Sequence, residues 1–310
     1  MILGFDIGGT KCAVITAETL ENGIKITAKE KILTDLKLKP VEMLERLFAL
    51  ADKILSGKKP DRIGISCGGP LDSKKGVIIS PPNLRGWINV PAADIVKARY
   101  GVPVRLLNDA NACAVAEWKF GAGKGFRNIV FLTFGTGLGA GLILDGKLYV
   151  GTNDNAGEVG HIRLEDDGPV GYGKAGSFEG FCSGGGIARL GKTLAEKAIE
   201  KGTVPLYAGG EITAKTIAEA AEKGDETAIE VYRICGEKLG KGLSVLIDIL
   251  NPERIIIGSI FARSESLIRK YAEEVIKNEA LGVSADVCRI VPAALGEQIG
   301  DYAAVAAAFY

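Results

Sequence analysis

The sequence lacks an excess of charge of either sign, because its 38 lysines and arginines are balanced by 38 aspartates and glutamates. A balanced chain has no electrostatic attraction for nucleic acid or for anionic lipid, so we expect neither a nucleic acid nor a membrane as a partner. No segment approaches the roughly 18 continuous apolar residues that a membrane helix needs. Met1 leads directly into a predicted strand, which leaves no room for a signal peptide. We therefore expect a cytoplasmic protein.

The sequence also lacks paired cysteines. None of its six cysteines belongs to a C-x-x-C pair, and most lie inside apolar runs: Cys12, Cys67, Cys113, Cys182, Cys235 and Cys288. This pattern predicts buried free thiols in a reducing compartment rather than a disulfide framework. The 310 residues, 47% of them apolar, provide enough core for about two domains.

The stretch Leu107-Asn108-Asp109 follows an apolar run at 102–106 and predicts a buried strand that ends at polar residues and opens a helix over 110–120. Open α/β sheets bind their ligands at the carboxyl ends of strands. Asp109 could there accept a proton from a substrate hydroxyl, or it could only N-cap the helix. The spacing alone leaves both interpretations open.

A glycine turn, Gly8-Gly9-Thr10-Lys11, separates two apolar strands at the start of the chain and predicts a hairpin. Paired glycines let their backbone amides approach phosphate oxygens, and Asp6 is placed to hold a hydrated magnesium ion beside them. An ordinary tight hairpin explains the same residues.

The same organisation returns after a glycine-rich loop at 121–125, which predicts a hinge or domain boundary. A strand at 128–133, a glycine turn at 134–139 and a strand at 140–144 repeat the pattern of residues 2–15. Two such turns indicate a duplicated architecture with a cleft between its halves, and they favour nucleotide binding.

Two further ligand candidates are the strand end Gly68-Gly69 and Asn83 in a proline-stiffened loop, although each also fits a plain turn or loop.

Periodicity predicts most of the remaining elements. Strands are expected at 24–33, 62–67, 254–258 and 288–291, and helices at 41–55, 92–100, 185–201, 214–223, 225–250, 265–278 and 301–309. Apolar residues from Ile229 to Leu246 recur every three or four positions, which indicates a helix face in the core or at a subunit interface.

Four separated motifs carry a family resemblance, and Asn108-Asp109 is one of them. The segment 5–11 resembles the first phosphate motif of the actin/hexokinase/Hsp70 ATPase superfamily, and 133–139 resembles the second. More narrowly, Ala156-Gly157-Glu158-Val159-Gly160-His161 resembles the signature of the ROK family (repressors, open reading frames, kinases). The resemblance covers essentially the whole chain. It implies an α/β fold of two actin-like (ribonuclease-H-like) domains with an interdomain cleft: residues 1–121, joined by a C-terminal helix at about 297–310, and residues 122–296.

The resemblance also implies roles for residues at matching positions. Asp109 matches the base that accepts the proton of the sugar hydroxyl. Matching sugar contacts are Gly68, Gly69, Asn83, Asn108, Asp109, Glu158, His161 and Glu179. Matching ATP contacts are Gly8, Gly9, Thr10, Lys11, Thr133, Gly135, Thr136, Gly137 and Gly258. Carboxylates, an amide and an imidazole suit the adjacent hydroxyls of a hexose independently of the family.

Two departures from the family pattern stand out. Ser259 follows Gly258 where relatives commonly have a second glycine in the adenosine-binding turn. Many relatives hold a structural zinc ion with the signature histidine and three cysteines, but Val170, Tyr172 and Ser177 stand at the cysteine positions here.

Tetrahedral zinc needs about four ligands. His161, the only histidine, has Cys182 as its one nearby thiol. We therefore expect no zinc, with the loop at 170–179 held by packing of residues such as Tyr172 and Phe178.

The implied activity is that of an ATP- and magnesium-dependent hexose kinase of carbohydrate metabolism and glycolysis, acting as a homodimer on the 6-hydroxyl of glucose. N-acetylmannosamine, N-acetylglucosamine, allose and fructose are alternative substrates. A sugar-responsive repressor is the competing interpretation, but such regulators carry a helix-turn-helix module before the first phosphate motif, and here that motif follows Met1 directly. A sugar-independent ATPase of the superfamily would not need the segment 156–161.

Overall fold

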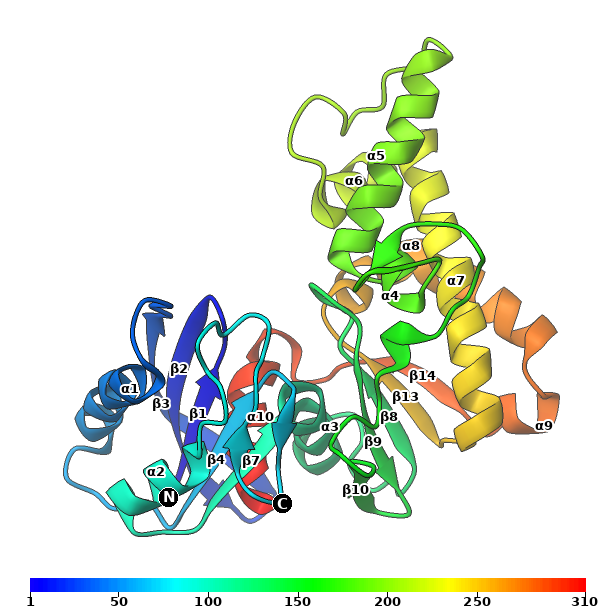
Figure 1. Ribbon diagram of the computed structural model, residues 1–310. Helices are drawn as coiled ribbons and strands as arrows, with labels where there is room; N and C mark the ends of the chain where they lie inside the picture. Colours follow the sequence, from blue (N-terminus) through cyan, green and yellow to red (C-terminus); the bar gives the residue numbers. More distant parts are fainter. The chain divides into compact units, whose positions relative to one another are not determined.

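The chain folds into two units in the computed structural model, which describes residues 1–310 (Figure 1). Unit 1 consists of Met1–Arg127, Gly141–Ala156 and Ala294–Tyr310, and unit 2 consists of Asn128–Ala140 and Gly157–Ala293. The expected second domain, 122–296, therefore includes three stretches that belong to unit 1 in the structure, namely 122–127, 141–156 and 294–296. The C-terminal residues also belong to unit 1.

A five-stranded sheet in the order β3-β2-β1-β4-β7 forms the centre of unit 1. The first three strands of the chain are antiparallel neighbours, whereas β1, β4 and β7 run parallel. Because Ile7 pairs with Cys67 and Cys67 with Asn108, the carboxyl ends of the parallel strands lie at one edge of the sheet. The strands are β1 (Ile2–Ile7), β2 (Lys11–Leu20), β3 (Gly23–Leu33), β4 (Arg62–Cys67) and β7 (Val104–Asn108).

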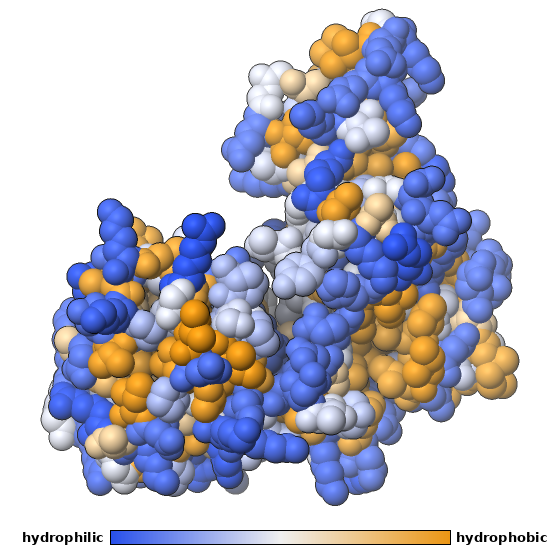
Figure 2. Space-filling view, in the orientation of Figure 1, coloured by the Kyte–Doolittle hydropathy of each residue, from blue (hydrophilic) through white to orange (hydrophobic).

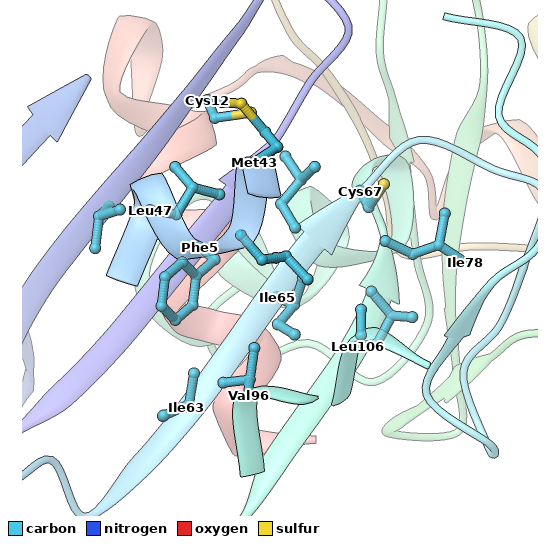
Figure 3. Packing of buried hydrophobic residues seen from close by; sticks show 14 of the residues in the cluster. Phe5, Cys12, Met43, Leu47, Ile63, Ile65, Cys67, Ile78, Val96 and Leu106 are labelled. Atoms are coloured by element: carbon cyan, nitrogen blue, oxygen red, sulfur yellow. The ribbon is translucent and has the colours of Figure 1, made fainter. Parts of the chain in front are cut away.

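One face of this sheet packs against α1 (Pro40–Leu55) and α2 (Ala92–Tyr100). Alternate residues of β1, among them Phe5, point to this face because successive side chains of a strand point to opposite sides. Figure 3 shows Phe5 and Ile65 from the sheet packed with Met43 and Leu47 of α1. All of these side chains are buried.

The opposite face packs against the C-terminal helix α10 (Ile299–Ala306) and the 3-10 turn η3 (Ala307–Phe309). The approach is so close that a Cβ on Gly64 would lie 2.2 Å from the carbonyl oxygen of Ala304 and 2.7 Å from the amide nitrogen of Ala308. Glycine in the strand and alanine in the helix therefore allow the helix backbone to contact the sheet.

A second five-stranded sheet has the order β10-β9-β8-β13-β14. In it β8, β13 and β14 run parallel, and β9 and β10 form an antiparallel hairpin. The strands are β8 (Ile129–Leu132), β9 (Ala140–Leu144), β10 (Lys147–Tyr149), β13 (Arg254–Ile257) and β14 (Arg289–Pro292).

The large helices of unit 2 are close to the predicted ones: α5 (Gly184–Glu200), α6 (Ala214–Glu222), α7 (Glu226–Leu250) and α8 (Ile260–Glu279). The expected apolar face of α7 is buried from Val231 to Ile247, but Ile229 lies off it and is 36% exposed. The predicted start of α8 is wrong by five residues. The structure adds one turn, Ile260–Arg263, before a non-helical kink at Ser264 (φ −121°, ψ 26°).

Several short elements were not predicted, because two to four residues give no periodicity to detect. They are β5 (Leu71–Asp72), β6 (Val77–Ile78), β10 (Lys147–Tyr149), η1 (Val159–His161), β11 (Val170–Gly171), β12 (Lys174–Ala175), α4 (Phe178–Phe181), α9 (Gly282–Ala285) and η2 (Gly296–Gln298).

Hydrophilic side chains cover much of the surface visible in Figure 2, with apolar patches on both units. No helix combines the length and the apolar character that crossing a membrane requires. All six cysteines are free thiols, and all but the partly buried Cys113 are buried, as their apolar surroundings predicted.

Candidate active site

Asn108 and Asp109 lie where β7 ends and α3 (Asp109–Phe120) begins, one residue earlier than predicted. The helix N-cap is Asn108 rather than Asp109. Oδ1 of Asn108 accepts a hydrogen bond from the N–H of Ala110 at 3.0 Å, and Oδ1 of Asp109 accepts from the same N–H at 2.8 Å. Oδ2 of Asp109 takes no part in this cap.

The two glycines that follow β4 lie opposite these polar groups. A Cβ on Gly68 would lie 3.9 Å from Oδ2 of Asp109, and a Cβ on Gly69 would lie 3.2 Å from Nδ2 of Asn108. Unit 1 therefore brings four of the predicted sugar contacts together. A side chain at either glycine would occupy the space in front of the carboxylate or the amide.

Asp109 is solvent-exposed, yet the surrounding protein raises the pKa of its carboxyl. Desolvation is the largest cause, and the hydrogen bond from the N–H of Ala110 opposes it. While ionised, a carboxylate with a raised pKa accepts protons more readily than an ordinary one.

Asp6 is the penultimate residue of β1 and lies on the α10 side of the sheet, and its carboxyl has a pKa raised to about 6. Burial is the largest cause, the negative charges of Asp109 and Asp301 add to it, and Lys29 and Lys11 oppose it. Asp301 on α10 is itself buried and forms an ion pair with Lys29 of β3. Sequence reasoning missed this pair, because its members lie near opposite ends of the chain and carry no motif.

The donor set around Asp6 suits magnesium better than a metal that needs a protein cage. No cluster of three His, Cys, Asp or Glu side chains is placed to hold a metal ion. Magnesium usually binds one or two carboxylates and completes its shell with water and substrate phosphates. The partly buried carboxylate of Asp6, beside a glycine turn, fits that description.

The first glycine turn is held from two sides. The hydroxyl of Thr34 donates to the carbonyl of Gly8 at 2.6 Å, and the N–H of Thr34 donates to the carbonyl of Thr10 at 3.0 Å. A Cβ on Gly9 would lie 2.2 Å from the carbonyl oxygen of Asn83, so the backbone of Asn83 packs directly on the turn. Thr10, Lys11 and Asn83 are exposed to solvent.

The second glycine turn satisfies much of its own hydrogen bonding. The hydroxyl of Thr133 accepts from the N–H of Gly139 at 3.0 Å and so closes the turn. The N–H of Gly135 donates to the carbonyls of Thr133 at 3.0 Å and Gly137 at 3.1 Å. Thr133 and the amide of Gly135 are therefore engaged within the turn, whereas Thr136 is exposed.

Two other segments of unit 2 bond to the backbone of this turn. The N–H of Gly184, at the start of α5, donates to the carbonyl of Gly135 at 2.8 Å. The N–H of Ile260, at the start of α8, donates to the carbonyl of Phe134 at 2.9 Å, which places Gly258 beside the turn. Gly184 was not predicted, although a run of three glycines at the start of a helix signals a close backbone approach.

The signature at 156–161 also packs against the second turn. A Cβ on Gly157 would lie 2.1 Å from the carbonyl oxygen of Ala140, and a Cβ on Gly160 would lie 2.3 Å from that of Leu138. Glycine at both positions lets the signature lie along the turn. Glu158, between them, is exposed to solvent.

Glu179, on α4, connects the signature to the turn. Its Oε2 accepts a hydrogen bond from the N–H of Leu138 at 3.0 Å, and a Cβ on Gly137 would lie 2.7 Å from the same oxygen. One carboxylate oxygen of Glu179 therefore belongs to the second glycine turn, and the other makes no bond to this turn.

His161 is exposed and packs edge to face on Tyr172, with 5.3 Å between the ring centroids. Tyr172 is 70% exposed, whereas Phe178 is buried. These are the two side chains that we expected to hold the loop.

The residues around His161 do not fit a zinc site. The hydroxyl of Ser177 is used as the N-cap of α4, where it accepts from the N–H of Gly180 at 3.1 Å. The thiol of Cys182 is buried and donates to the carbonyl of Cys235 at 3.5 Å. His161 is left without the further ligands that tetrahedral zinc requires.

Comparisons with known proteins agree with these motifs. The ROK family model matches residues 2–308. A glucokinase of Streptomyces coelicolor is 32% identical over 306 residues, which cover 97% of this chain and 95% of the glucokinase. A xylose repressor of Caldicellulosiruptor bescii is 32% identical over 288 residues, which cover 90% of this chain and 70% of the repressor.

Among solved structures, a ROK family glucokinase from Streptomyces griseus in complex with glucose and AMPPNP is similar to the chain. The TM-score is 0.78 and the identity 31%, over 99% of this chain and 98% of that chain. The expected α/β, actin-like fold class is thereby confirmed. Both glycine turns and the signature lie inside the matched regions, and the chain belongs to the ROK family.

Proposed function

We propose that the chain is an ATP-dependent hexose kinase that transfers the γ-phosphoryl group of ATP to the 6-hydroxyl of glucose, with Asp109 as the base. The observation that carries this proposal is the position of Asp109. One carboxylate oxygen is fixed by the helix cap, and the other faces Gly68, where no side chain blocks a hydroxyl. Membership of the ROK family and the similarity to glucokinases over nearly the whole chain support the same activity.

In unit 1 the proposed roles divide between binding and proton transfer. Nδ2 of Asn108 donates to a sugar hydroxyl, because Oδ1 is occupied by the N–H of Ala110. Oδ2 of Asp109 accepts the proton of the attacking hydroxyl as the oxygen–phosphorus bond forms. Lys11 and the amides of the first glycine turn stabilise the charge on the phosphates.

In unit 2 the proposed contacts come from the signature and from the second turn. Glu158, His161 and the second oxygen of Glu179 hold neighbouring sugar hydroxyls, since acceptors and an imidazole can each bond a hydroxyl. The turn itself supports ATP phosphates with Thr136 and the amides that are not used internally. Gly258 leaves room for the nucleoside.

Magnesium, bound through water to Asp6, would neutralise phosphate charge during the transfer. Burial raises the pKa of Asp6 to about 6, with Lys29 and Lys11 opposing the rise, so the carboxyl is still ionised at neutral pH and can hold the ion.

The proposal is tested by incubating the purified protein with ATP, magnesium and a panel of glucose, N-acetylmannosamine, N-acetylglucosamine, allose and fructose while ADP is measured. We expect ADP release that requires a sugar and is fastest with glucose. Preference for another hexose would correct the substrate and keep the activity. ATP turnover that ignores every sugar would overturn the kinase assignment. Sugar binding without any turnover would instead favour a regulator.

A homodimer in the cytoplasm remains our prediction for its state in the cell, and sedimentation of the purified protein tests the dimer.

A further inference from the structure

Ser259 has a backbone conformation that serine rarely adopts. It follows Gly258 at the end of β13 with φ 55° and ψ −111°, values close to the first central position of a type II′ turn. Glycine dominates that position because a Cβ is crowded there. A serine kept in such a conformation is strained, and strained residues concentrate where a side chain has a functional use.

Backbone hydrogen bonds on both sides fix Ser259 against the second glycine turn. The N–H of Gly258 donates to the carbonyl of Leu132 at 3.0 Å, and the N–H of Ile260 donates to the carbonyl of Phe134 at 2.9 Å. The hydroxyl oxygen of Ser259 lies 3.5 Å from the position that a Cβ on Gly135 would take. The hydroxyl therefore lies directly beside the turn that the proposed function assigns to phosphate.

The direction of the hydrogen bond from Arg263 leaves the hydroxyl proton of Ser259 unused. Nη2 of Arg263 donates to Oγ of Ser259 at 3.3 Å. A guanidinium has no acceptor, so the serine cannot return a hydrogen bond to it. No protein group accepts the proton of Ser259 in the structure. The kink at Ser264 separates the turn Ile260–Arg263 from the rest of α8, and this turn carries Arg263 back toward Ser259.

We propose that Ser259 is a phosphate-binding residue for the nucleotide, whose hydroxyl is oriented by Arg263 and donates to a phosphate oxygen at the second glycine turn. Arg263 acts in two ways in this arrangement. Its hydrogen bond to one lone pair of the Ser259 oxygen directs the hydroxyl proton away from Arg263. Its positive charge also strengthens the hydrogen bond from Ser259 to the phosphate. Charge-assisted hydrogen bonds of this kind are stronger than neutral ones. The inference rests on the proposed function, because it takes a nucleotide as the ligand of the turn.

The test measures the affinity for the non-hydrolysable nucleotide AMPPNP by calorimetry without sugar, together with the Tm of each unliganded variant. The variants are Ser259→Ala, Ser259→Gly, Arg263→Met and the double variant Ser259→Ala/Arg263→Met. Ser266→Ala is the matched control, because Ser266 is an exposed serine on the same helix. KM values for ATP and for glucose are measured in parallel.

We expect Ser259→Ala to raise the Kd for AMPPNP and the KM for ATP about tenfold, which is typical of a lost hydrogen bond to a charged group, and to leave the KM for glucose unchanged. Ser259→Gly should raise the Tm because strain is relieved, and should still bind AMPPNP as weakly as Ser259→Ala does. A serine with only a structural role would give a glycine variant that is more stable and binds normally. Arg263→Met should weaken binding, and the double variant should be no weaker than Ser259→Ala, because the two residues act as one unit.

Kd values for both Ser259 variants within about twofold of wild type would overturn the inference. So would effects of Ser259→Ala and Arg263→Met that simply add, or a wild-type protein that does not bind AMPPNP. Normal AMPPNP binding with no phosphorylation of any sugar would overturn the proposed function and leave the assignment of Ser259 intact.

Discussion

Oε2 of Glu179 accepts a hydrogen bond from the backbone N–H of Leu138 at 3.0 Å, so a side chain expected to contact sugar also holds the second glycine turn. Under the proposed function, this one carboxylate couples the two substrates, so we expect a change at Glu179 to alter the binding of both.

We predict that Glu179→Ala raises the KM for both glucose and ATP and lowers the free energy of unfolding by about 1–3 kcal/mol, the cost of leaving a buried N–H without an acceptor. Glu179→Gln keeps an acceptor oxygen and should lose less stability. Kinetics and urea unfolding measure the two effects, with Glu274→Ala on an exposed part of α8 as the control. A raised KM for glucose with an unchanged KM for ATP would contradict the coupling.

Asp109→Asn should lower kcat roughly 10²–10⁴-fold, the usual contribution of general-base catalysis. The amide retains an oxygen that can accept the N–H of Ala110, so the helix cap and the Kd for glucose should be preserved. Single-turnover kinetics and glucose titration test this, with the exposed Asp286→Asn as control. A kcat that stays within a few-fold of wild type would exclude Asp109 as the base, because the loss of a general base costs far more than that.

Asp6 should make the magnesium-free protein less stable as pH rises. Its pKa is about 6 in the folded state and 3.8 for an ordinary aspartate in water, so between these values the folded state binds the proton more tightly. The free energy of unfolding therefore decreases as pH rises from about 3.8 to about 6, by at most about 3 kcal/mol. At higher pH the titration of Asp6 changes it no further.

Asp6→Asn removes the negative charge that destabilises the folded state above about pH 6. In EDTA the variant should be more stable than wild type at neutral pH, with the difference shrinking toward pH 4. Its kinase activity should fall sharply, because the amide cannot replace the carboxylate. Urea unfolding across pH supplies the measurement, and an Asp6→Asn variant that is less stable than wild type at neutral pH would refute it.

Gly64→Ala should destabilise unit 1 by about 3 kcal/mol, because the new Cβ would meet helix backbone that cannot rotate away. Gly209→Ala is the matched control, since a Cβ there meets nothing within 4 Å. Thermal unfolding of both variants decides the matter. Equal Tm values for the two would mean that α10 shifts at little cost.

Purified protein should contain far less than one zinc ion per chain, because Ser177 and Cys182 are committed to other hydrogen bonds. Elemental analysis after dialysis tests this. A stoichiometric zinc content would show that other ligands complete the site.

Much of the fold could be predicted from local patterns, because apolar runs bounded by glycine mark strands whatever the rest of the chain does. The parallel strands β1, β4 and β7 and the long helix α7 are of this kind. The start of α8 was mistaken because Ile260 and Phe261 continue the apolar run of β13, while the turn at Ser259 depends on bonds to Leu132 and Phe134.

The candidate site could be predicted only as far as its motifs extend. The glycine turns and Asp109 stand in recognisable segments. The ion pair between Lys29 and Asp301 and the bond from Leu138 to Glu179 join residues that are distant in sequence, so only the folded chain reveals them. The sequence offered Asp109 as the helix cap, but the N-cap is Asn108. Two adjacent polar residues compete for one N–H, and spacing does not decide between them.

The close contact between Gly64 and the C-terminal helix has a consequence for synthesis of the protein. The strands of unit 1 leave the ribosome before unit 2 does, but the residues that cover one face of their sheet, from Ala304 to Ala308, are made after unit 2. Until then the buried side chains of that face, Ile2 and Ile15 among them, have no cover. Unit 1 therefore completes its folding only after all of unit 2 has been synthesised.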